Sequence, residues 1–482
     1  MPKQYSSLED LTPFHPVKTL KQWLQNRIGL DRAILYTVMA RFWSGLAGLV
    51  TLVVIARYLT PSEQGYYYTF YSLVALQIVF ELGFSFVVLQ LAAHERAQLS
   101  FLPGGEIVGD AVAHSRLASV LQKCVRWYVA AGVLMACVLI PAGLYFFSSH
   151  QRSGAPLGWK LPWCLLVVAT MLAFQIDPVF SFLEGCGFVQ QVAHRRLVQA
   201  ILGSALAWSA MIIHHGLYAP ALIIFGQVAV GMAFMFSGMH KPLLRGLLAY
   251  PVREHAVAWR AEIWSFQWKI AVSWLAGYFI YQLFSPVLFA YQGPVAAGQM
   301  GMSMSIAAAV GSVGLAWMST KASPFGALVA RGKFRELDRI FFKTLWQSTV
   351  VVTVGAAALL TIYIVAAPYY PKIALRILPP WVLGLLLLNT IMNHVVCSQA
   401  LYLRAHKQEP FYVQAIISAV LIGVCTLFLG RYYGASAVVV GVFAQGILFA
   451  VPYATYIFVT KRKLWHEYEL PEQIKDTVRP VC

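Results

Sequence analysis

The chain has 482 residues, of which 59% are hydrophobic and only 11% are charged. A water-soluble protein of this size needs far more polar surface, so the composition excludes that class. The formal net charge of +17 could indicate nucleic-acid binding, and the test is where the basic residues lie.

Apolar runs recur from end to end, and each is long enough to cross about 30 Å of hydrocarbon. Because lipid offers the backbone no hydrogen-bond partners, such runs must be helical. The sequence therefore predicts an all-α polytopic membrane protein with about twelve transmembrane helices. The expected helices are at residues 33–58, 66–91, 126–147, 161–183, 193–214, 218–238, 266–290, 299–320, 345–367, 379–402, 411–430 and 434–459.

The stretch YLTPSEQGYYYTF, residues 58–70, interrupts the first two apolar runs. Proline, glycine and polar residues between apolar runs are typical of a turn. Tyrosine favours the boundary between lipid headgroups and water. We expect a turn on the outer side, with its tyrosines at the membrane interface.

The basic residues are concentrated in alternate connections. With the N-terminus inside, the inner segments hold 28 of the 36 Lys and Arg residues. This bias is the positive-inside signature, and it predicts that both termini are cytoplasmic. The positive charge orients the protein in its membrane, so nucleic acid is not an expected partner.

An internal repeat is indicated by Pro61 and Gly65, which match Pro294 and Gly298 at an offset of 233 residues. Each pair opens the second helix of a six-helix set, so two related lobes are expected around a central cavity. The predicted units are a cytoplasmic segment with an interfacial helix at 1–32, an N-terminal lobe at 33–238, a basic cytoplasmic linker at 239–263, a C-terminal lobe at 264–459 and a cytoplasmic tail at 460–482.

Arg41 lies about eight residues into the first helix, which places it about 12 Å deep. It belongs to a stripe at helical spacing with Thr37, Ser44, Gly48 and Thr51. Small residues in such a stripe could form a helix-packing seam. A charge inside the membrane instead favours a cavity, and we predict substrate binding by Arg41, Ser44 and Thr51.

The 233-residue offset pairs Arg41 with Trp274 on the seventh helix. Trp274, Tyr278 and Tyr281 share one face there, with Lys269 nearer the inner end. Aromatic faces and hydroxyls suit a sugar, so these four residues are predicted to face the central cavity. The alternatives are an ordinary packed aromatic face and a Lys269 side chain that reaches the inner headgroups.

Two acidic residues, Glu81 and Asp177, fall inside predicted helices. Each could form a structural ion pair with Arg41 or Lys269, or bind and release an ion that drives transport, either H⁺ or Na⁺. Arg195 is expected at the inner interface instead.

Enzymatic chemistry has little support in the sequence. The seven cysteines lack CxxC spacing, and no nucleotide-binding loop occurs, so no metal, cofactor or catalytic residue is predicted. The outer connections at 148–160 and 367–378 are too short for a folded module. The prediction is a transporter.

Three stretches resemble a known family: ARYLTPSEQGYYYTFYSLVALQIVFELGFSFVVLQ, SFLEGCGFVQQVAHRRLVQAIL and GPVAAGQMGMSMSIAAAVGSVGLAWMSTKASPFGALVARGKF. They are similar to polysaccharide transporters of the multidrug/oligosaccharidyl-lipid/polysaccharide (MOP) exporter superfamily, namely the Wzx-type O-antigen flippases and their relatives. The resemblance implies a bacterial inner-membrane flippase with two six-helix lobes around a cationic lumen. It also implies a polyprenyl-pyrophosphate-linked glycan as substrate, such as an undecaprenyl-linked lipopolysaccharide O-antigen unit. Polysaccharide polymerase or ligase machinery would be a partner, alongside membrane lipids.

In this hypothesis the lobes alternate access to the cleft, Arg41 attracts phosphate and the aromatic wall holds sugar. Only Arg41 and Lys269 supply basic groups near the spans, which argues against a highly anionic glycan. A cation or drug antiporter of the same superfamily is an alternative that Glu81 and Asp177 permit and Arg41 opposes. A membrane glycosyltransferase, polymerase or ligase is a further alternative that the short outer loops disfavour.

Overall fold

The computed structural model describes residues 32–102, 104–151, 157–238, 240–252, 256–258, 264–406 and 408–466. The predicted interfacial helix before residue 32 and most of the predicted tail lie outside these ranges. The helices of the N-terminal half are α2 (Arg32–Tyr58), α3 (Pro61–Val74), η1 (Ala75–Gln77), α4 (Ile78–Glu81), α5 (Phe84–Arg96), α6 (Ala111–Ser149), α7 (Lys160–Gly185), α8 (Val189–Ile212), η2 (Gly216–Tyr218) and α9 (Ala219–Met235). After α10 (His240–Ala249), those of the C-terminal half are α11 (Trp264–Tyr281), α12 (Phe284–Gln292), α13 (Pro294–Ser319), α14 (Ala322–Ala330), α15 (Phe334–Ala366), α16 (Pro371–Ala374), α17 (Pro380–Arg404), α18 (Tyr412–Tyr432), α19 (Ala435–Gln445), η4 (Gly446–Ala450) and α20 (Val451–His466).

The chain is a helical, multi-pass membrane protein, as predicted. Within the described residues, nine helices are long and apolar enough to span a membrane, and the bent pair Pro61–Glu81 and Phe84–Arg96 makes a tenth. The other two predicted spans correspond to α8 and to α11 with α12. A short antiparallel hairpin of β1 (Leu99–Phe101) and β2 (Ile107–Gly109) joins α5 to α6.

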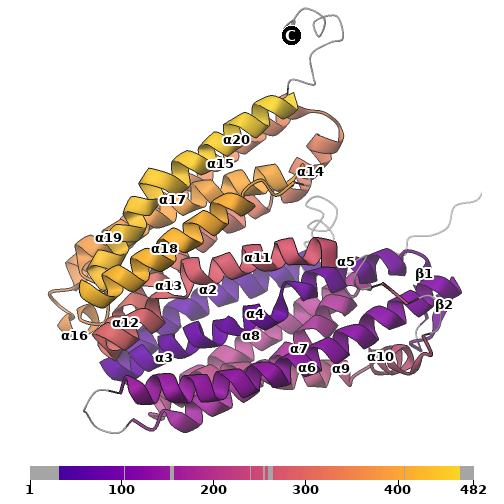
Figure 1. Cartoon of the computed structure of the whole chain (residues 1–482), viewed down its shortest axis with the longest axis horizontal. Helices are drawn as coiled ribbons and strands as arrows, with labels where there is room; N and C mark the ends of the chain where they lie inside the picture. The colour runs from indigo at the N-terminus through magenta and orange to yellow at the C-terminus, as the bar shows by residue number, and fades with distance from the viewer. Residues whose placement is uncertain are drawn as a thin grey trace, which may run out of the picture.

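The two halves pack their helices in matching pairs. In the N-terminal half α2 packs on α8, α6 on α7, and α7 on α9; in the C-terminal half α11 packs on α18, α15 on α17, and α17 on α19 and α20. The repetition is what an internal repeat of six helices produces. Figure 1 shows the halves as two layers, indigo to magenta and red to yellow.

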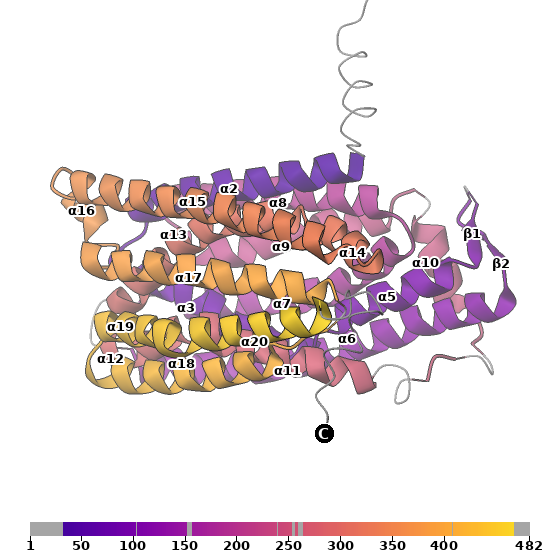
Figure 2. The same cartoon turned by 90° about the horizontal axis from the view of Figure 1, so that it is seen from above.

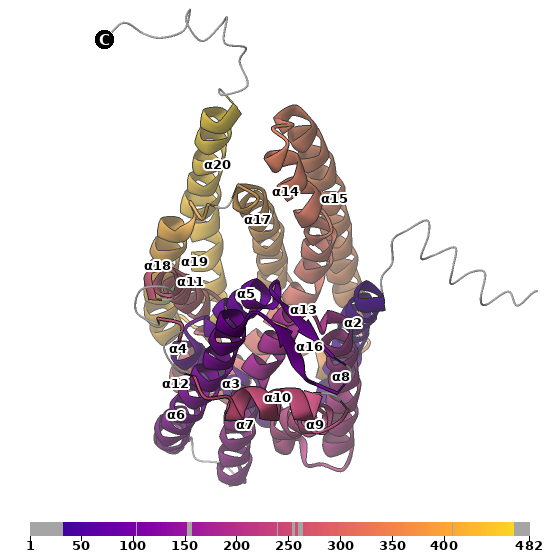
Figure 3. The ribbon, with the colours of Figure 1, turned by 90° about the vertical axis from the view of Figure 1, so that its right-hand side faces the viewer.

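The layers meet at one end, called here the closed end, and splay apart toward the other, the open end (Figure 1). The view from above places α16 and α12 at the closed end and α10 and the hairpin at the opposite one (Figure 2). Viewed along the molecule from the open end, α14, α15 and α20 stand well apart from α7 and α10 (Figure 3). Among the described residues, the hairpin, α10 and α14, which belong to the predicted basic connections, lie at the open end (Figures 2 and 3).

The closed end is built on the two matching Pro-x-x-x-Gly segments, which begin α3 and α13 and contact each other directly. Thr60 caps α3, because its side chain accepts from the backbone N–H of Glu63 while the Glu63 carboxylate accepts from that of Thr60. A Cβ atom on Gly65 would lie 1.9 Å from the carbonyl oxygen of Pro294, so only glycine permits this approach.

Side chains complete the closed end from both halves. Gln64 donates to the carbonyl oxygen of Gly298 at 2.8 Å and to that of Arg376 at 3.0 Å. Arg376 in turn donates to the Gln64 side chain at 3.3 Å and to the carbonyl oxygen of Leu59. Each half therefore binds backbone of the other.

The predicted position of the tyrosines is wrong. The turn is confined to Leu59 and Thr60, and Tyr66 and Tyr67 lie inside α3 with exposed fractions of 3% and 5%. Tyr66 contacts Phe289 of α12, with ring centroids 4.8 Å apart. Tyrosine favours an interface only when its side chain faces that interface, and here Tyr66 is also covered by Phe147 and Trp159 of its own half.

Candidate functional site

The N-terminal half encloses a cavity of about 370 Å³, called here the N-half cavity. Its lining comes from α3 to α7 and α9, with one residue contributed from the break between α11 and α12. Polar groups gather there from several helices: Gln77, Glu81, Ser85, Asp177, Gln227 and Gln282. The two predicted carboxylates thus line the same cavity.

A broken helix positions Glu81. The second predicted span is not continuous: α4 ends at Glu81, and Leu82 and Gly83 have φ angles of +52° and +68°. The left-handed conformation is costly for leucine and easy for glycine. The two parts of the span are inclined by 46°. Such breaks leave backbone groups available to ligands in membrane transporters.

Asp177 is paired with Arg195. The predicted partners were Arg41 and Lys269, but Nη2 of Arg195 lies 3.3 Å from Oδ1 of Asp177. Arg195 is 3% exposed and its guanidinium stacks on Phe180, whereas the Asp177 side chain is 68% exposed on the cavity side. The expected inner-interface position of Arg195 is wrong because this residue faces the helices of its own half.

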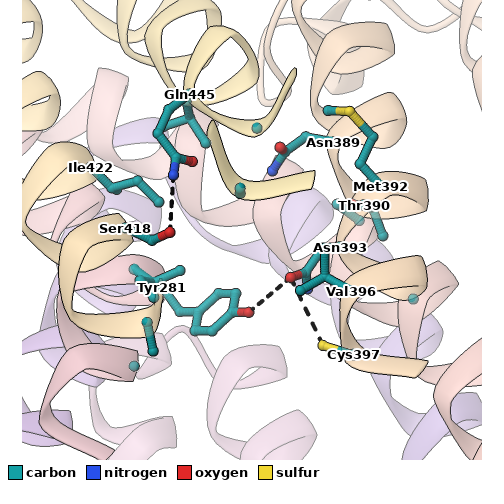
Figure 4. A pocket seen from close by; sticks show the side chains of 18 of the residues that line it. Tyr281, Asn389, Thr390, Met392, Asn393, Val396, Cys397, Ser418, Ile422 and Gln445 are labelled. Carbon is teal, nitrogen blue, oxygen red and sulfur yellow. Dashed lines mark hydrogen bonds between the residues drawn. The ribbon is translucent and has the colours of Figure 1, made fainter. Parts of the chain in front are cut away.

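The C-terminal half encloses a larger cavity of about 600 Å³, called here the C-half cavity, lined by α11 to α13 and α17 to α20 (Figure 4). The hydroxyl of Tyr281 donates to Oδ1 of Asn393 at 3.3 Å, and Cys397 contacts the same oxygen at 3.9 Å. Across the cavity Gln445 donates to Ser418 at 3.1 Å.

Amide side chains are the feature that sequence analysis missed here. Asn389 and Asn393 are four residues apart on α17, so they face the same side of that helix. Charged residues inside the predicted spans do not indicate this cavity. The signal in the sequence is Asn or Gln inside a predicted span, since an amide is also costly to bury unpaired.

The residues of the predicted stripe on α2 do not all face the same partner. Arg41 donates to Ser319 at the end of α13, at 3.3 Å, and so links the two halves. A Cβ atom on Gly48 would meet nothing within 4 Å, which argues against a tight packing seam. Thr51 instead accepts from Trp208 on α8 at 2.8 Å, and Ser44 donates to the carbonyl oxygen of Ala40 in its own helix.

The residues of the predicted aromatic face on α11 also lie in different surroundings. Tyr281 lines the C-half cavity, Tyr278 is buried and Trp274 is 39% exposed. The Lys269 side chain lies outside the part of the chain that the structure describes. Gln282, the residue after Tyr281, lines the N-half cavity, so the break between α11 and α12 reaches both cavities.

Comparisons with solved structures identify the fold. One neighbour is described as the inward-facing conformation of a multidrug resistance MATE family transporter of the MOP superfamily. It is 12% identical, with a TM-score of 0.65 over 94% of this chain and 99% of that chain. The lipid II flippase MurJ in an inward closed conformation is 13% identical, with a TM-score of 0.55 over 93% and 94%.

A MATE family transporter in the outward-facing conformation has a TM-score of 0.50 at 13% identity, over 90% of this chain and 95% of that chain. No family model and no curated protein matches the sequence. These likenesses show the fold: the chain has the two-lobed, all-α polytopic fold of MOP-superfamily transporters, as the sequence predicted.

Proposed function

We propose that this protein is a flippase that exports a polyprenyl-pyrophosphate-linked oligosaccharide across the bacterial inner membrane by alternating access. The observation that carries the proposal is the position of Arg41. It is a cation within a membrane helix, and it reaches from one half to Ser319 of the other. Ser319 ends α13 just before α14, which lies at the open end (Figure 3). A phosphate that enters between the halves would find this guanidinium, which forms paired hydrogen bonds with phosphate oxygens.

The substrate would enter from the cytoplasmic leaflet with the open end facing the cytoplasm, and its lipid tail would remain in the bilayer. Trp274 and Tyr281 would contact sugar, together with Tyr278, Ser44, Thr51 and Lys269 of the predicted cavity. Reversal of the closed and open ends would release the headgroup outside, and the polymerase or ligase machinery of a surface polysaccharide would act on it there. MurJ, which shares the fold, is described as a lipid II flippase, and this supports a lipid-linked substrate.

Transport also needs a source of free energy, such as an ion gradient, and the N-half cavity is a candidate site where the ion would bind. Glu81 and Asp177 line it together, and two carboxylates in one cavity can bind H⁺ or Na⁺. We propose that the ion binds there and favours one of the two conformations, since a ligand shifts an equilibrium only by its differential affinity.

A second function has a specific observation in its favour. The same carboxylates would suit an organic cation, and the MATE neighbours are described as multidrug resistance transporters. Arg41 favours the flippase, and so does the C-half cavity, where the charged lining residues Arg404 and Glu409 pair with each other. Efflux of ethidium from cells that express the protein, without any change in glycan export, would favour the drug antiporter.

The direct test follows lipid-linked oligosaccharides in a deletion strain and determines the leaflet that they occupy. The flippase predicts accumulation in the inner leaflet and rescue by the wild-type protein. Arg41→Ala should abolish rescue at normal abundance, because the phosphate loses its cation. Arg57→Ala, at the other end of the same helix, is the matched control and should rescue fully. Rescue by Arg41→Ala would remove the role given to that residue, and normally flipped glycan in the deletion strain would refute the flippase.

A further inference from the structure

We propose that the C-half cavity is a binding site for the uncharged sugar portion of the exported molecule. Asn389, Asn393 and Gln445 would be its hydrogen-bonding groups. The inference rests on the proposed function and deepens it. It places the sugar in a cavity inside the C-terminal half and not only in the space between the two halves.

The charge of the cavity selects a neutral ligand. The charged residues among those lining it are Arg404 and Glu409, in the part of the chain that the structure describes. Arg404 donates twice to Glu409, at 2.6 and 2.8 Å, so the two charges offset each other. They lie at the open-end limit of the cavity, where α17 ends. Since an unpaired ion is costly in such surroundings, the deeper part of the cavity suits an uncharged polar group.

The hydrogen-bonding capacity of the cavity is only partly used. Oδ1 of Asn393 accepts from Tyr281, which leaves its NH₂ group to donate elsewhere. The Asn389 amide has no hydrogen bond to any described residue. Gln445 donates to Ser418 and retains its carbonyl oxygen as an acceptor. A sugar hydroxyl both donates and accepts, so a ring with several hydroxyls could satisfy all three amides.

The backbone opposite Asn389 has a conformation that is frequent at functional sites. Residues Gly446–Ala450 form the π-helical segment η4. A Cβ atom on Gly446 would lie 2.9 Å from Oδ1 of Asn389, so glycine allows the amide to lie against this segment. Tyr281, Met304 and Ile422 add apolar surface that suits the C–H faces of a sugar ring.

The size of the cavity fits more than one sugar ring. It extends along α17 from Leu386 to Arg404, eighteen residues or about 27 Å of helix. A volume of about 600 Å³ falls within the range usual for ligand sites. The length and the volume together suit a short oligosaccharide.

The test uses photo-cross-linking in cells that make the native glycan, labelled with a radioactive sugar. The full-length protein would carry benzoylphenylalanine at Ile422, which is buried and lines the cavity, or at Val424, which is 61% exposed on the same helix α18. We expect radioactive sugar on the protein cross-linked from Ile422 and background labelling from Val424. Equal or absent labelling from both positions, in strains where the leaflet test shows normal flipping, would overturn the cavity site and leave the flippase intact.

A second measurement removes the hydrogen bonds. Asn393→Leu and Gln445→Leu have nearly the native side-chain volume and should lower glycan export about tenfold at normal abundance. Gln347→Leu is the matched control, because Gln347 is exposed on α15 and away from the cavity. Wild-type export by both cavity variants would also overturn the site, whereas failure of the leaflet test in wild-type cells would refute the flippase itself.

Discussion

The two halves of this protein pack their helices in the same pairs, yet their cavities differ in chemistry. The N-half cavity contains two carboxylates, Glu81 and Asp177, in addition to its amides. In the C-half cavity the charged residues Arg404 and Glu409 pair with each other, and the other polar groups include amides and hydroxyls. The position that the 233-residue offset pairs with Glu81 is Gly314, where an added Cβ would lie 2.8 Å from the His394 ring. Helix packing therefore repeats while the lining diverges, which allows one half to bind an ion and the other to bind substrate.

The largest expected effect concerns the contact between the halves. Gly65→Ala places a Cβ 1.9 Å from the Pro294 carbonyl oxygen, and since backbone cannot yield locally, α3 and α13 must separate. We expect the closed end to lose about 3 kcal/mol of stability, the upper part of the overpacking range. Hydrogen–deuterium exchange of Pro61–Val74 and Pro294–Ser319 measures the opening.

The same contact provides two graded controls. Gly298→Ala meets its nearest backbone atom, N of Gly65, at 3.0 Å and should open the closed end less. Gly48→Ala meets nothing within 4 Å and should leave exchange unchanged. Equal exchange in all three variants would show that the glycines do not hold the halves together.

Next in size is the effect of the buried cation in the N-terminal half. Arg195→Met removes the partner of Asp177 and the stacking on Phe180, so we expect a loss of about 2 kcal/mol in unfolding free energy. Arg196→Met is a neighbouring control, because Arg196 pairs with Glu184 at 2.7 Å with its side chain 55% exposed. Its loss should stay below about 1 kcal/mol. The measurement is thermal unfolding in detergent. Equal melting temperatures for the two variants would contradict the larger stabilising role given to Arg195.

The proposal that the N-half cavity binds the ion and the C-half cavity binds the sugar can be tested through the ion dependence of export. Glu81→Gln and Asp177→Asn should lower export about tenfold and abolish its response to a proton or sodium gradient, because a neutral amide cannot replace the charge. Glu184→Gln, outside the cavity, should behave as wild type. Asn393→Leu should lower export while the ion response persists. An unchanged ion response in both carboxylate variants would place the coupling site elsewhere.

The sequence predicted a polytopic helical fold with about twelve spans because lipid imposes length and hydrophobicity on every span. It also predicted the correspondence of Pro61 and Gly65 with Pro294 and Gly298. It could not predict that Gly65 and Gly298 lie against each other, because a repeat offset in sequence contains no information about distance in space. The domain boundary at 239–263 and the bound substrate remain predictions.

The errors at Tyr66 and Arg195 share one physical cause: the composition of a helix does not indicate which of its faces packs against protein. Tyr66 was expected at the interface because the residues that cover it, Phe147, Trp159 and Phe289, are all distant from it in sequence. Arg195 lies within the polar run VQQVAHRR, whose composition indicates an interface although one arginine of the run is buried. The break at Leu82 was missed because leucine is a poor indicator of a left-handed conformation.

The smallest expected effect distinguishes a Tyr281 hydroxyl that only supports Asn393 from one that itself binds sugar. Tyr281→Phe removes only the hydroxyl that donates to Asn393, so a supporting bond should cost about 1 kcal/mol, or about fivefold in export. Tyr456→Phe, with Tyr456 65% exposed on α20, is the control and should export normally. If Tyr281→Phe lowers export as much as Asn393→Leu does, the Tyr281 hydroxyl itself binds sugar. The reason is that Asn393 is still present in Tyr281→Phe and would keep its own contacts with the sugar. Full export by Tyr281→Phe would instead mean that Asn393 is held by its helix alone.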